Sequence, residues 1–383
     1  MILVSGVGRP RLDGAVAEPA QAQDGITAES MGARIAQLEG DRYALGTDAE
    51  RTKLGEDAEY IQNQMGAFGL NVQEDPVTYS GETFPNVIGA LPGTACPEAS
   101  IIVGAHYDAG EGATGADDNA SGVAAVLEIA RLLSTQSFQP SIQFVGFSFE
   151  EDGLIGSKQM AREAGTAHAR IAGVVVLDMI AYTCDEPGCQ TYPAGYSGPD
   201  VGNFVSVTGN TVSAPLLQTF TEASASAVPS LPVSSLEVPG NGDHDTRGSD
   251  HSPFWDWGYQ ALAVDDTADF RNPNYHTPAD TLSTLNLSFA ADVTNATLAA
   301  VVAAATADSD ADGRADACGE PAGPVGGVAD LPDFVGAPTE KAGGSSEASG
   351  WTAGEAAVVG GLVAGIALLL ATGAWYAGRR RLR

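Results

Sequence analysis

Histidine and carboxylate side chains recur in five short segments of this sequence, and these are the residue types that bind divalent cations or move protons. The segments are His106–Asp108, Gly115–Gly122 with Asp117 and Asp118, Phe149–Ser157 with Glu150 and Glu151, Leu177–Met179 with Asp178, and Tyr275–Thr281 with His276 and Asp280. Adjacent carboxylates such as Glu150 and Glu151 would repel each other in one site, unless a cation lay between them. Two histidines with several Asp and Glu side chains are typical of a water-accessible Zn²⁺ or Mn²⁺ site.

Each segment alone is a weak signal, because a lone His-x-Asp or Asp-Asp pair more often marks a turn or a solvated surface. His168 and His244 lie outside the segments and are expected at the surface. His251 is expected to support metal ligands rather than to bind metal itself. Ser121 lacks a surrounding GxSxG motif, so we expect it to cap a helix rather than to act as a nucleophile.

Strand-like apolar runs come directly before three of these segments. They cover residues 100–105, 142–149 and 171–178, with further strands expected over 86–90 and 260–264 and helices over 49–68, 121–133 and 288–305. This alternation predicts an α/β fold with a mixed, mostly parallel central sheet and helices on both faces. Ligands bind beyond the carboxyl ends of the strands in such sheets, where we expect the segments to meet.

The order and spacing of the motifs resemble peptidase family M28, the co-catalytic di-zinc aminopeptidases. HxD, ADDNxSG, EExGLxGS, LDM, SDHxxF and NPxYHTxxDT follow one another within residues 26–306, and NVIG at 86–89 also fits. The resemblance implies the zinc exopeptidase (phosphorylase/hydrolase-like) fold. It also implies a metallo-aminopeptidase whose substrates are peptides with a free N-terminus.

Position by position, the resemblance implies two zinc ions per chain. His106 and Asp178 would bind one ion, Glu151 and His276 would bind the other, and Asp118 would bridge the two. Two such ions lie about 3.5–4 Å apart and lower the pKa of a water between them toward 7.

Three further roles follow from the resemblance. Glu150 would act as general base, taking a proton from the attacking water and passing it to the leaving amine. Asp108 would accept a hydrogen bond from the far nitrogen of His106, and Tyr275 would donate to the developing oxyanion. The peptide bond after Asp118 is often cis in this family. A free α-amine would be attracted to the acidic cluster, which would favour chain termini over internal bonds.

Two other functions remain open at this point. A glutaminyl cyclase shares the scaffold without hydrolysing peptides, and a catalytically inactive ectodomain would only bind its partner. The complete ligand set argues against the second, since loss of Glu150 or of one histidine would be its mark. We expect the side-chain pocket among four residues, Met179, Tyr182, Phe254 and Tyr259.

The four cysteines allow three pairings. Cys184 and Cys189 are expected to form a small disulfide at the rim of the site. Cys96 and Cys318 are expected to join the end of the domain to its core. A disulfide-bonded chain of this kind suits an oxidising compartment outside the cytoplasm.

An acidic loop over residues 307–320 is a separate signal. Its carboxylates are Asp308, Asp310, Asp312 and Asp316, which resemble the calcium loop of thrombospondin type 3 repeats. Hard oxygen ligands from a short loop suit Ca²⁺, but Gly319 stands where an EF-hand would have Glu. The alternative is an acidic linker.

Charge and composition exclude some functions. The chain has 18 Lys and Arg against 49 Asp and Glu, a net charge of −31, so we expect no nucleic-acid partner. A hydrophobic content of 44% excludes a wholly disordered chain.

The two ends carry the targeting signals. Residues 1–25 are a short N-terminal segment that we interpret as the remnant of a signal region, and 26–306 are the peptidase domain. A Gly/Pro/Ser-rich linker over 321–353 leads to a predicted transmembrane helix over 354–378 and a basic tail over 379–383. By the positive-inside rule that tail is cytoplasmic. The expectation is a single-pass protein of the cell membrane with an extracytoplasmic catalytic domain.

Overall fold

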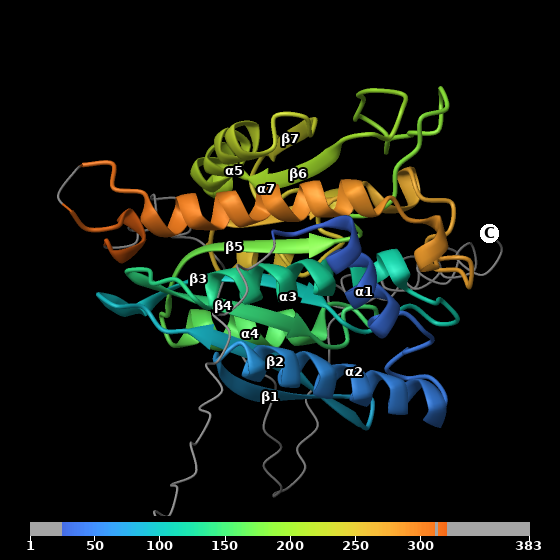
Figure 1. Cartoon of the computed structure of the whole chain (residues 1–383), viewed down its shortest axis with the longest axis horizontal. Helices are drawn as coiled ribbons and strands as arrows, with labels where there is room; N and C mark the ends of the chain where they lie inside the picture. The colour runs from blue at the N-terminus through green and yellow to red at the C-terminus, as the bar shows by residue number, and fades with distance from the viewer. Residues whose placement is uncertain (1–24, 311–312, 320–383) are drawn as a thin grey trace, which may run out of the picture. The chain divides into compact units, whose positions relative to one another are not determined.

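An eight-stranded mixed β-sheet forms the centre of the fold in the computed structural model (Figure 1), which describes residues 25–310 and 313–319. The strand order is β1-β2-β4-β3-β5-β8-β6-β7. Strands β4, β3, β5 and β8 run parallel in the middle, β1, β2 and β6 introduce antiparallel pairs, and β7 is parallel to β6. The strands are β1 Asn71–Tyr79, β2 Glu82–Leu91, β3 Cys96–His106, β4 Pro140–Phe147, β5 Arg170–Asp178, β6 Val205–Asn210, β7 Val233–Val238 and β8 Ala261–Asp265. The predicted mixed α/β sheet is confirmed.

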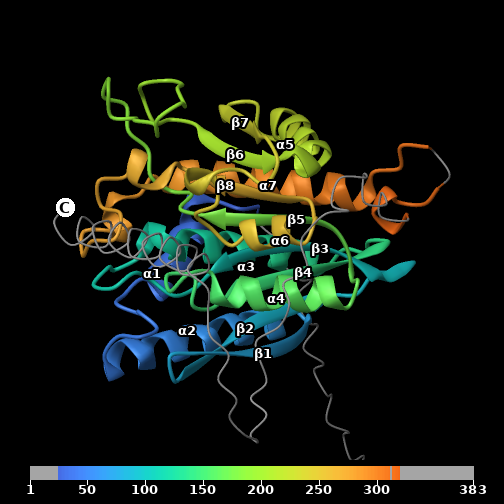
Figure 2. The same ribbon diagram turned by 180° about the vertical axis from the view of Figure 1, so that it is seen from behind.

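Helices cover both faces of this sheet. Figure 1 is seen from the face of α1, α3 and α7, and Figure 2 from the opposite face, which carries α4 and α6. The helices are α1 Ala28–Leu38, α2 Asp48–Ala67, α3 Gly122–Leu133, α4 Ile155–Thr166, α5 Ala214–Ala227, α6 Ser252–Asp256 and α7 Leu287–Thr306.

Two hydrophobic cores explain why the central strands are apolar throughout. Along β5, Val175 and Leu177 pack into the larger core, whereas Val174 and Val176 pack into the smaller core on the other face. Successive side chains of a strand point to opposite faces, so a strand buried on both sides needs an unbroken apolar run. The apolar run of such a strand therefore ends where the chain leaves the sheet. The first polar residue after the run lies at the edge of the sheet.

Local capping fixes where the first two helices begin. The side chain of Thr27 accepts a hydrogen bond from the backbone of Ser30, and Thr47 does the same for Glu50, with both bonds returned. Such capping boxes satisfy amide groups that a helix start leaves without intrahelical partners.

Helix α7 is, among the described residues, the one helix long and apolar enough to cross a membrane. It packs against α5, α1 and α3, and it buries Phe289, Val293 and Ala300 in the larger core. We therefore assign its apolar character to its place in the core. The predicted transmembrane helix over 354–378 lies outside the described residues, as do the segment over 1–24, the linker over 321–353 and the tail over 379–383.

Both predicted disulfides are confirmed: Cys96 pairs with Cys318, and Cys184 pairs with Cys189. The first joins the start of β3 to a segment beyond α7. There Gln139 also accepts a hydrogen bond from the Ala315 amide at 2.9 Å, and Cys318 is fully buried. The ordered fold thus continues past residue 306, where the sequence pattern places the domain end.

Candidate active site

Three parallel neighbouring strands carry the predicted site residues to one edge of the sheet. His106 and Asp178 are the last residues of β3 and β5, and Glu150 and Glu151 follow the end of β4. Because β4, β3 and β5 are adjacent and parallel, their carboxyl ends lie side by side. This is the edge at which open α/β sheets bind ligands.

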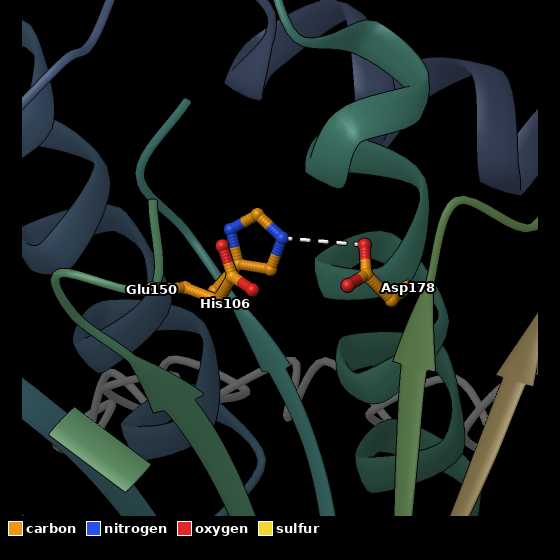
Figure 3. Close-up of side chains that lie close together, drawn as sticks. All are labelled: His106, Glu150 and Asp178. Atoms are coloured by element: carbon orange, nitrogen blue, oxygen red, sulfur yellow. Dashed lines mark hydrogen bonds and ion pairs between the residues drawn. The ribbon is translucent and has the colours of Figure 1, made fainter. Parts of the chain in front are cut away.

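One histidine lies between carboxylates from two different elements. His106 is 1% exposed, and its Nε2 lies 3.2 Å from Oδ1 of Asp178 and 3.3 Å from Oδ1 of Asp118. Figure 3 shows the contact between the ring and Asp178, with the carboxylate of Glu150 next to the ring. Ligand atoms of these three residues, His106, Glu150 and Asp178, all lie within 4.8 Å of one another.

A second histidine faces the other oxygen of Asp118. Nε2 of His276 lies 3.1 Å from Oδ2 of Asp118 and 2.9 Å from Oε2 of Glu151. Each oxygen of Asp118 therefore faces a different histidine, and each histidine has a further carboxylate of its own. The five residues predicted to bind metal lie together in the arrangement that a bridging carboxylate requires.

The carboxylate of Asp108 lies beside Nδ1 of His106, and it has a second task that the sequence does not predict. Nδ1 of His106 is 3.2 Å from the backbone oxygen of Asp108 and 3.6 Å from its nearer carboxylate oxygen. The carboxylate also accepts hydrogen bonds from the amides of Glu150 and Glu151, at 3.2 and 3.1 Å. In a buried turn beyond a strand end, backbone amides have no partner in the sheet and need another hydrogen-bond acceptor. The carboxylate of Asp108 is the acceptor for the amides of Glu150 and Glu151.

Burial and mutual repulsion change how these side chains titrate. Burial, with the charge of Asp118, raises the pKa of Glu151 to about 7. Burial likewise raises the pKa of Glu150 well above its ordinary value. Burial opposes a charged ring at His276, but the hydrogen bonds to Asp118 and Glu151 outweigh it and raise its pKa to about 10. Burial first, and then the excess of carboxylates over histidines, keeps protons on these glutamates.

The donor set fits a divalent cation of the zinc class. It offers histidine nitrogens and carboxylate oxygens that approach one another closely, and a cation would displace the retained protons. The Oε1 atom of Glu151 is buried and has no hydrogen-bond partner among the described residues, so an acceptor there is left for another ligand. Ligand atoms of His106, Asp118 and Glu151 also lie within 4.8 Å of one another.

Backbone conformations at this edge are unusual. Phe149, Met179 and His276, each beside or at a predicted ligand, have left-handed φ angles of 54°, 55° and 54°. Non-glycine residues adopt this region only where surrounding contacts hold them there, and such positions gather at functional sites. The Asp118–Asn119 peptide bond is cis, in agreement with the family resemblance.

Tyr275 lies against the ring of its neighbour His276. The two rings are stacked, with centroids 3.8 Å apart and an angle of 19° between their planes. Burial and the charge of Asp118 raise the pKa of Tyr275, so its hydroxyl keeps its proton. A protonated hydroxyl is what an oxyanion donor needs, and that role stays a prediction.

A network of buried side chains beneath the site escaped the sequence reasoning. It binds the four consecutive amide groups that follow Asp178, so the chain beyond β5 is fixed although it belongs to no helix or strand. The pairs are Met179 with Asn119 at 3.3 Å, Ile180 with Ser121 at 3.1 Å, Ala181 with Asp117 at 3.0 Å and Tyr182 with Asp266 at 2.9 Å. The ADDNxS motif can be recognised in the sequence. That its side chains other than Asp118 bind the segment after β5 follows only from the folded structure.

This network corrects the expectation for Ser121. Its hydroxyl makes no capping bond to α3; it donates to the Asp117 carbonyl at 2.8 Å and accepts from Ile180. Ser121 is fully buried, and its part here is structural.

The other three histidines do not belong to the two ligand groups. His168 and His244 are exposed, as predicted. His251 is buried, and its Nε2 lies 3.0 Å from the carbonyl oxygen of Thr246. Its neighbour Asp250 is a fully buried carboxylate that contributes to the raised pKa of Glu150.

Of the four expected pocket residues, Tyr259 lies at the wrong edge of the sheet. Phe254 is buried against Phe147 on the α6 face, and the hydroxyl of Tyr259 donates to the carbonyl of Ala169, just before β5 starts. Since β5 runs toward the site, Ala169 lies at the opposite edge of the sheet. Met179 and Tyr182 lie at the correct edge, directly after Asp178.

The acidic loop brings three of its four predicted ligands together. Carboxylate oxygens of Asp308, Asp310 and Asp316 lie within 4.8 Å of one another, and all three residues are exposed. Asp312 lies outside the described residues. Calcium at this loop stays a prediction.

Comparison with known proteins agrees with this geometry. The family model for peptidase family M28 matches residues 86–301. An uncharacterized protein, YfbL of Escherichia coli, is 33% identical over 64% of this chain and 79% of its own length. A probable zinc metalloprotease of Pyrenophora tritici-repentis is 30% identical over 46% of this chain, and aminopeptidase YwaD of Bacillus subtilis 28% identical over 58%. This chain spans 44% and 46% of the lengths of those two relatives.

Solved structures share the fold. The LapA aminopeptidase of Legionella pneumophila superposes with a TM-score of 0.57 and 20% identity, covering 73% of this chain and 72% of the other. The glutaminyl cyclase of Porphyromonas gingivalis gives 0.55 and 19%, covering 73% of this chain and 99% of the other. At such identities the likeness concerns the fold alone. The match of the family model, the E. coli relative and the motif order together show that this chain belongs to peptidase family M28.

Proposed function

We propose that this protein is a zinc-dependent aminopeptidase that removes N-terminal residues from peptides. The observation that carries the proposal is the position of Asp118, whose two oxygens face His106 and His276 at 3.3 and 3.1 Å. Asp178 completes the first ligand group and Glu151 the second. Such an arrangement suits two cations that share one carboxylate.

Zinc is the ion that the zinc metalloproteases of this family imply. Bound zinc would act as a Lewis acid toward a water and toward the substrate carbonyl. The protein supplies the proton transfer. Glu150 lies beside His106 and Asp178, and its raised pKa suits a carboxylate that accepts a proton from the attacking water and returns it to the leaving nitrogen.

Preference for a free N-terminus would follow from charge. The site edge gathers four carboxylates against two histidines: Asp118, Glu150, Glu151 and Asp178. Two bound Zn²⁺ ions would balance these four carboxylates overall, and Glu150 is the one of the four that would bind no cation. A protonated α-amine would be attracted to Glu150, whereas an internal peptide bond brings no cation to the site.

A cyclase-like reaction is the main rival on this scaffold. The similarity to the P. gingivalis cyclase is 19% in sequence and so extends to the fold only. The assay that separates the functions supplies the purified full chain with zinc and either aminoacyl-anilides or glutaminyl peptides. Release of free amino acids supports the proposal, release of pyroglutamyl peptides supports the rival, and no turnover of either supports a binding domain.

We also propose that the catalytic domain lies outside the cytoplasm, held by the predicted helix over 354–378. Both disulfides support an oxidising compartment, since such bonds are rare in the cytosol. Protease protection in intact cells, with an intracellular protein as control, tests this orientation. Digestion of the domain only after cell lysis would contradict it.

A further inference from the structure

Asp280 is a buried carboxylate in the loop that carries His276, four residues further along the chain. It is fully buried and does not belong to the metal-ligand set. Nothing in the proposed chemistry uses it, and burying a carboxylate is costly unless hydrogen bonds compensate.

The hydrogen bonds that its oxygens accept all come from the short turn that presents Asp118. Oδ1 and Oδ2 of Asp280 accept the amide of Asp117 at 3.0 and 3.1 Å, and Oδ2 also accepts the amide of Asp118 at 3.0 Å. The backbone carbonyl of Asp280 accepts the amide of Ala116 at 3.1 Å. Three successive amides of the turn are thus bound by this one residue.

The two contacts of Asp118 tolerate little change in its position. Its two oxygens must reach two histidines on different elements, so a small rotation of its backbone would improve one contact and break the other. The two amides held by Asp280 are those of Asp118 itself and of the residue before it. Groups that orient a ligand in this way typically govern metal affinity.

The same residue also ties the two ligand loops together. His276 and Asp280 share one loop, and the hydroxyl of Thr114 donates to the carbonyl of Pro278 in that loop at 3.1 Å. Asp280 therefore sets the position of Asp118 relative to the loop that supplies His276. The short distance between His276 and Asp118 depends on that connection.

We propose that Asp280 is a positioning residue, which holds the turn of Asp118 so that this carboxylate can bind two zinc ions at once. The proposal rests on the proposed zinc site but not on the identity of the substrate. A residue needed only for general stability would change unfolding without changing zinc affinity in the folded protein.

The first test measures zinc affinity of the full chain by competition with a chromophoric chelator. Asp280→Asn keeps the shape and removes one of the two acceptor oxygens, and it is expected to weaken zinc binding about 10–100-fold. Asp280→Glu keeps the charge and is expected to recover part of that loss. The matched control is Asn210→Ala, which removes a buried side chain that holds the Ser213 amide at 3.0 Å, where β6 ends at the opposite edge of the sheet. It is expected to leave zinc affinity within about twofold of wild type.

The second test follows amide hydrogen exchange in the zinc-free protein, over a peptide that contains residues 116–118. Asp280→Asn should exchange there at least about tenfold faster than wild type, while peptides from β6 stay unchanged. Wild-type zinc affinity in a folded Asp280→Asn variant would overturn the proposal, as would equal losses in Asp280→Asn and Asn210→Ala. If wild-type protein binds zinc but cleaves no aminoacyl substrate, the proposed function fails while this inference is still decided by the two tests.

Discussion

At the residue scale, neighbouring side chains of the same type have different environments, and we propose different tasks for them. Glu150 and Glu151 are adjacent, yet Glu151 contacts His276 and Glu150 lies beside His106. In a strand they would point to opposite faces. They share one site because they follow the end of β4, in a turn whose amides Asp108 binds.

Glu150→Gln tests this division of tasks. The variant keeps the side-chain shape and removes the proton acceptor, so kcat for an aminoacyl-anilide should fall about 10²–10⁴-fold while KM and zinc content stay near wild type. Steady-state kinetics with metal analysis of the same sample measures both.

Glu151→Gln is the matched variant, because it changes the adjacent carboxylate by the same atoms. This variant should lose one zinc ion, because Glu151 contacts His276 and belongs to the second ligand group. Near-full turnover by Glu150→Gln, or loss of metal by that variant alone, would show that the roles are reversed.

Residue types and spacing predicted which side chains meet, because His, Asp and Glu are common ligands of such cations and their motifs here follow strand ends. They did not predict the hydrogen bonds that buried carboxylates accept from backbone amides. Asp108 and Asp280 are of a residue type that can bind metal, but their carboxylate oxygens accept hydrogen bonds from amides of other segments. Such partners are far apart in the chain, so only the folded structure identifies them.

At the element scale, the site depends on loops that connect regular elements and are fixed by side chains. Apolar runs predicted β3, β4 and β5 because those strands are buried on both faces. They did not predict β1, an edge strand whose side chains are mostly exposed or half-buried and which contains Pro76. Short strands such as β6 and β7 also lack a run long enough to separate them from loops.

Ser121→Ala tests the fixed segment beyond β5. The change removes the acceptor of the buried Ile180 amide and should lower the free energy of unfolding by about 1–3 kcal/mol. Turnover at saturating zinc should remain within about tenfold of wild type, because the hydroxyl contacts backbone groups only. Denaturant unfolding and kinetics check the two parts, and complete loss of activity in a folded variant would instead make Ser121 a catalytic residue.

At the scale of the whole molecule, the many buried carboxylates give zinc-free protein an unusual response to pH. Burial raises the pKa of Asp265 to about 6, of Asp250 to about 7 and of Asp280 to about 7. In the unfolded chain these carboxyl groups would have pKa values near 4. Between about pH 4 and pH 7 the folded protein therefore binds more protons than the unfolded chain does. Stability contributed by these groups is therefore present at low pH and lost as pH rises through their folded values.

Thermal unfolding of chelator-treated protein should show this directly. The unfolding temperature is expected to be lower at pH 8 than at pH 5, by on the order of 5 °C. Asp265→Asn should reduce the difference, since it removes one of the titrating groups. A zinc-free protein that is equally stable or more stable at pH 8 would contradict the assignment of burial as the cause.

The boundary between the catalytic domain and the proposed anchor is a second property of the whole molecule. A chain ending at Gly350 should be soluble and as active as the full chain, because it keeps every element of the described fold and the disulfide at Cys318. Sedimentation after membrane fractionation, followed by the anilide assay, compares the two forms. Misfolding or inactivity of the shorter chain would mean that the membrane segment is part of the fold.

The measurement that tests the central claim most directly is the zinc content of wild-type protein and of Asp118→Ala, each purified as the full chain and checked for folding. Two ions per wild-type chain are expected, and both should be lost from Asp118→Ala, because each of its oxygens faces a different histidine. Fully active wild-type protein with one zinc ion or none, or a folded Asp118→Ala variant that retains two, would contradict the account.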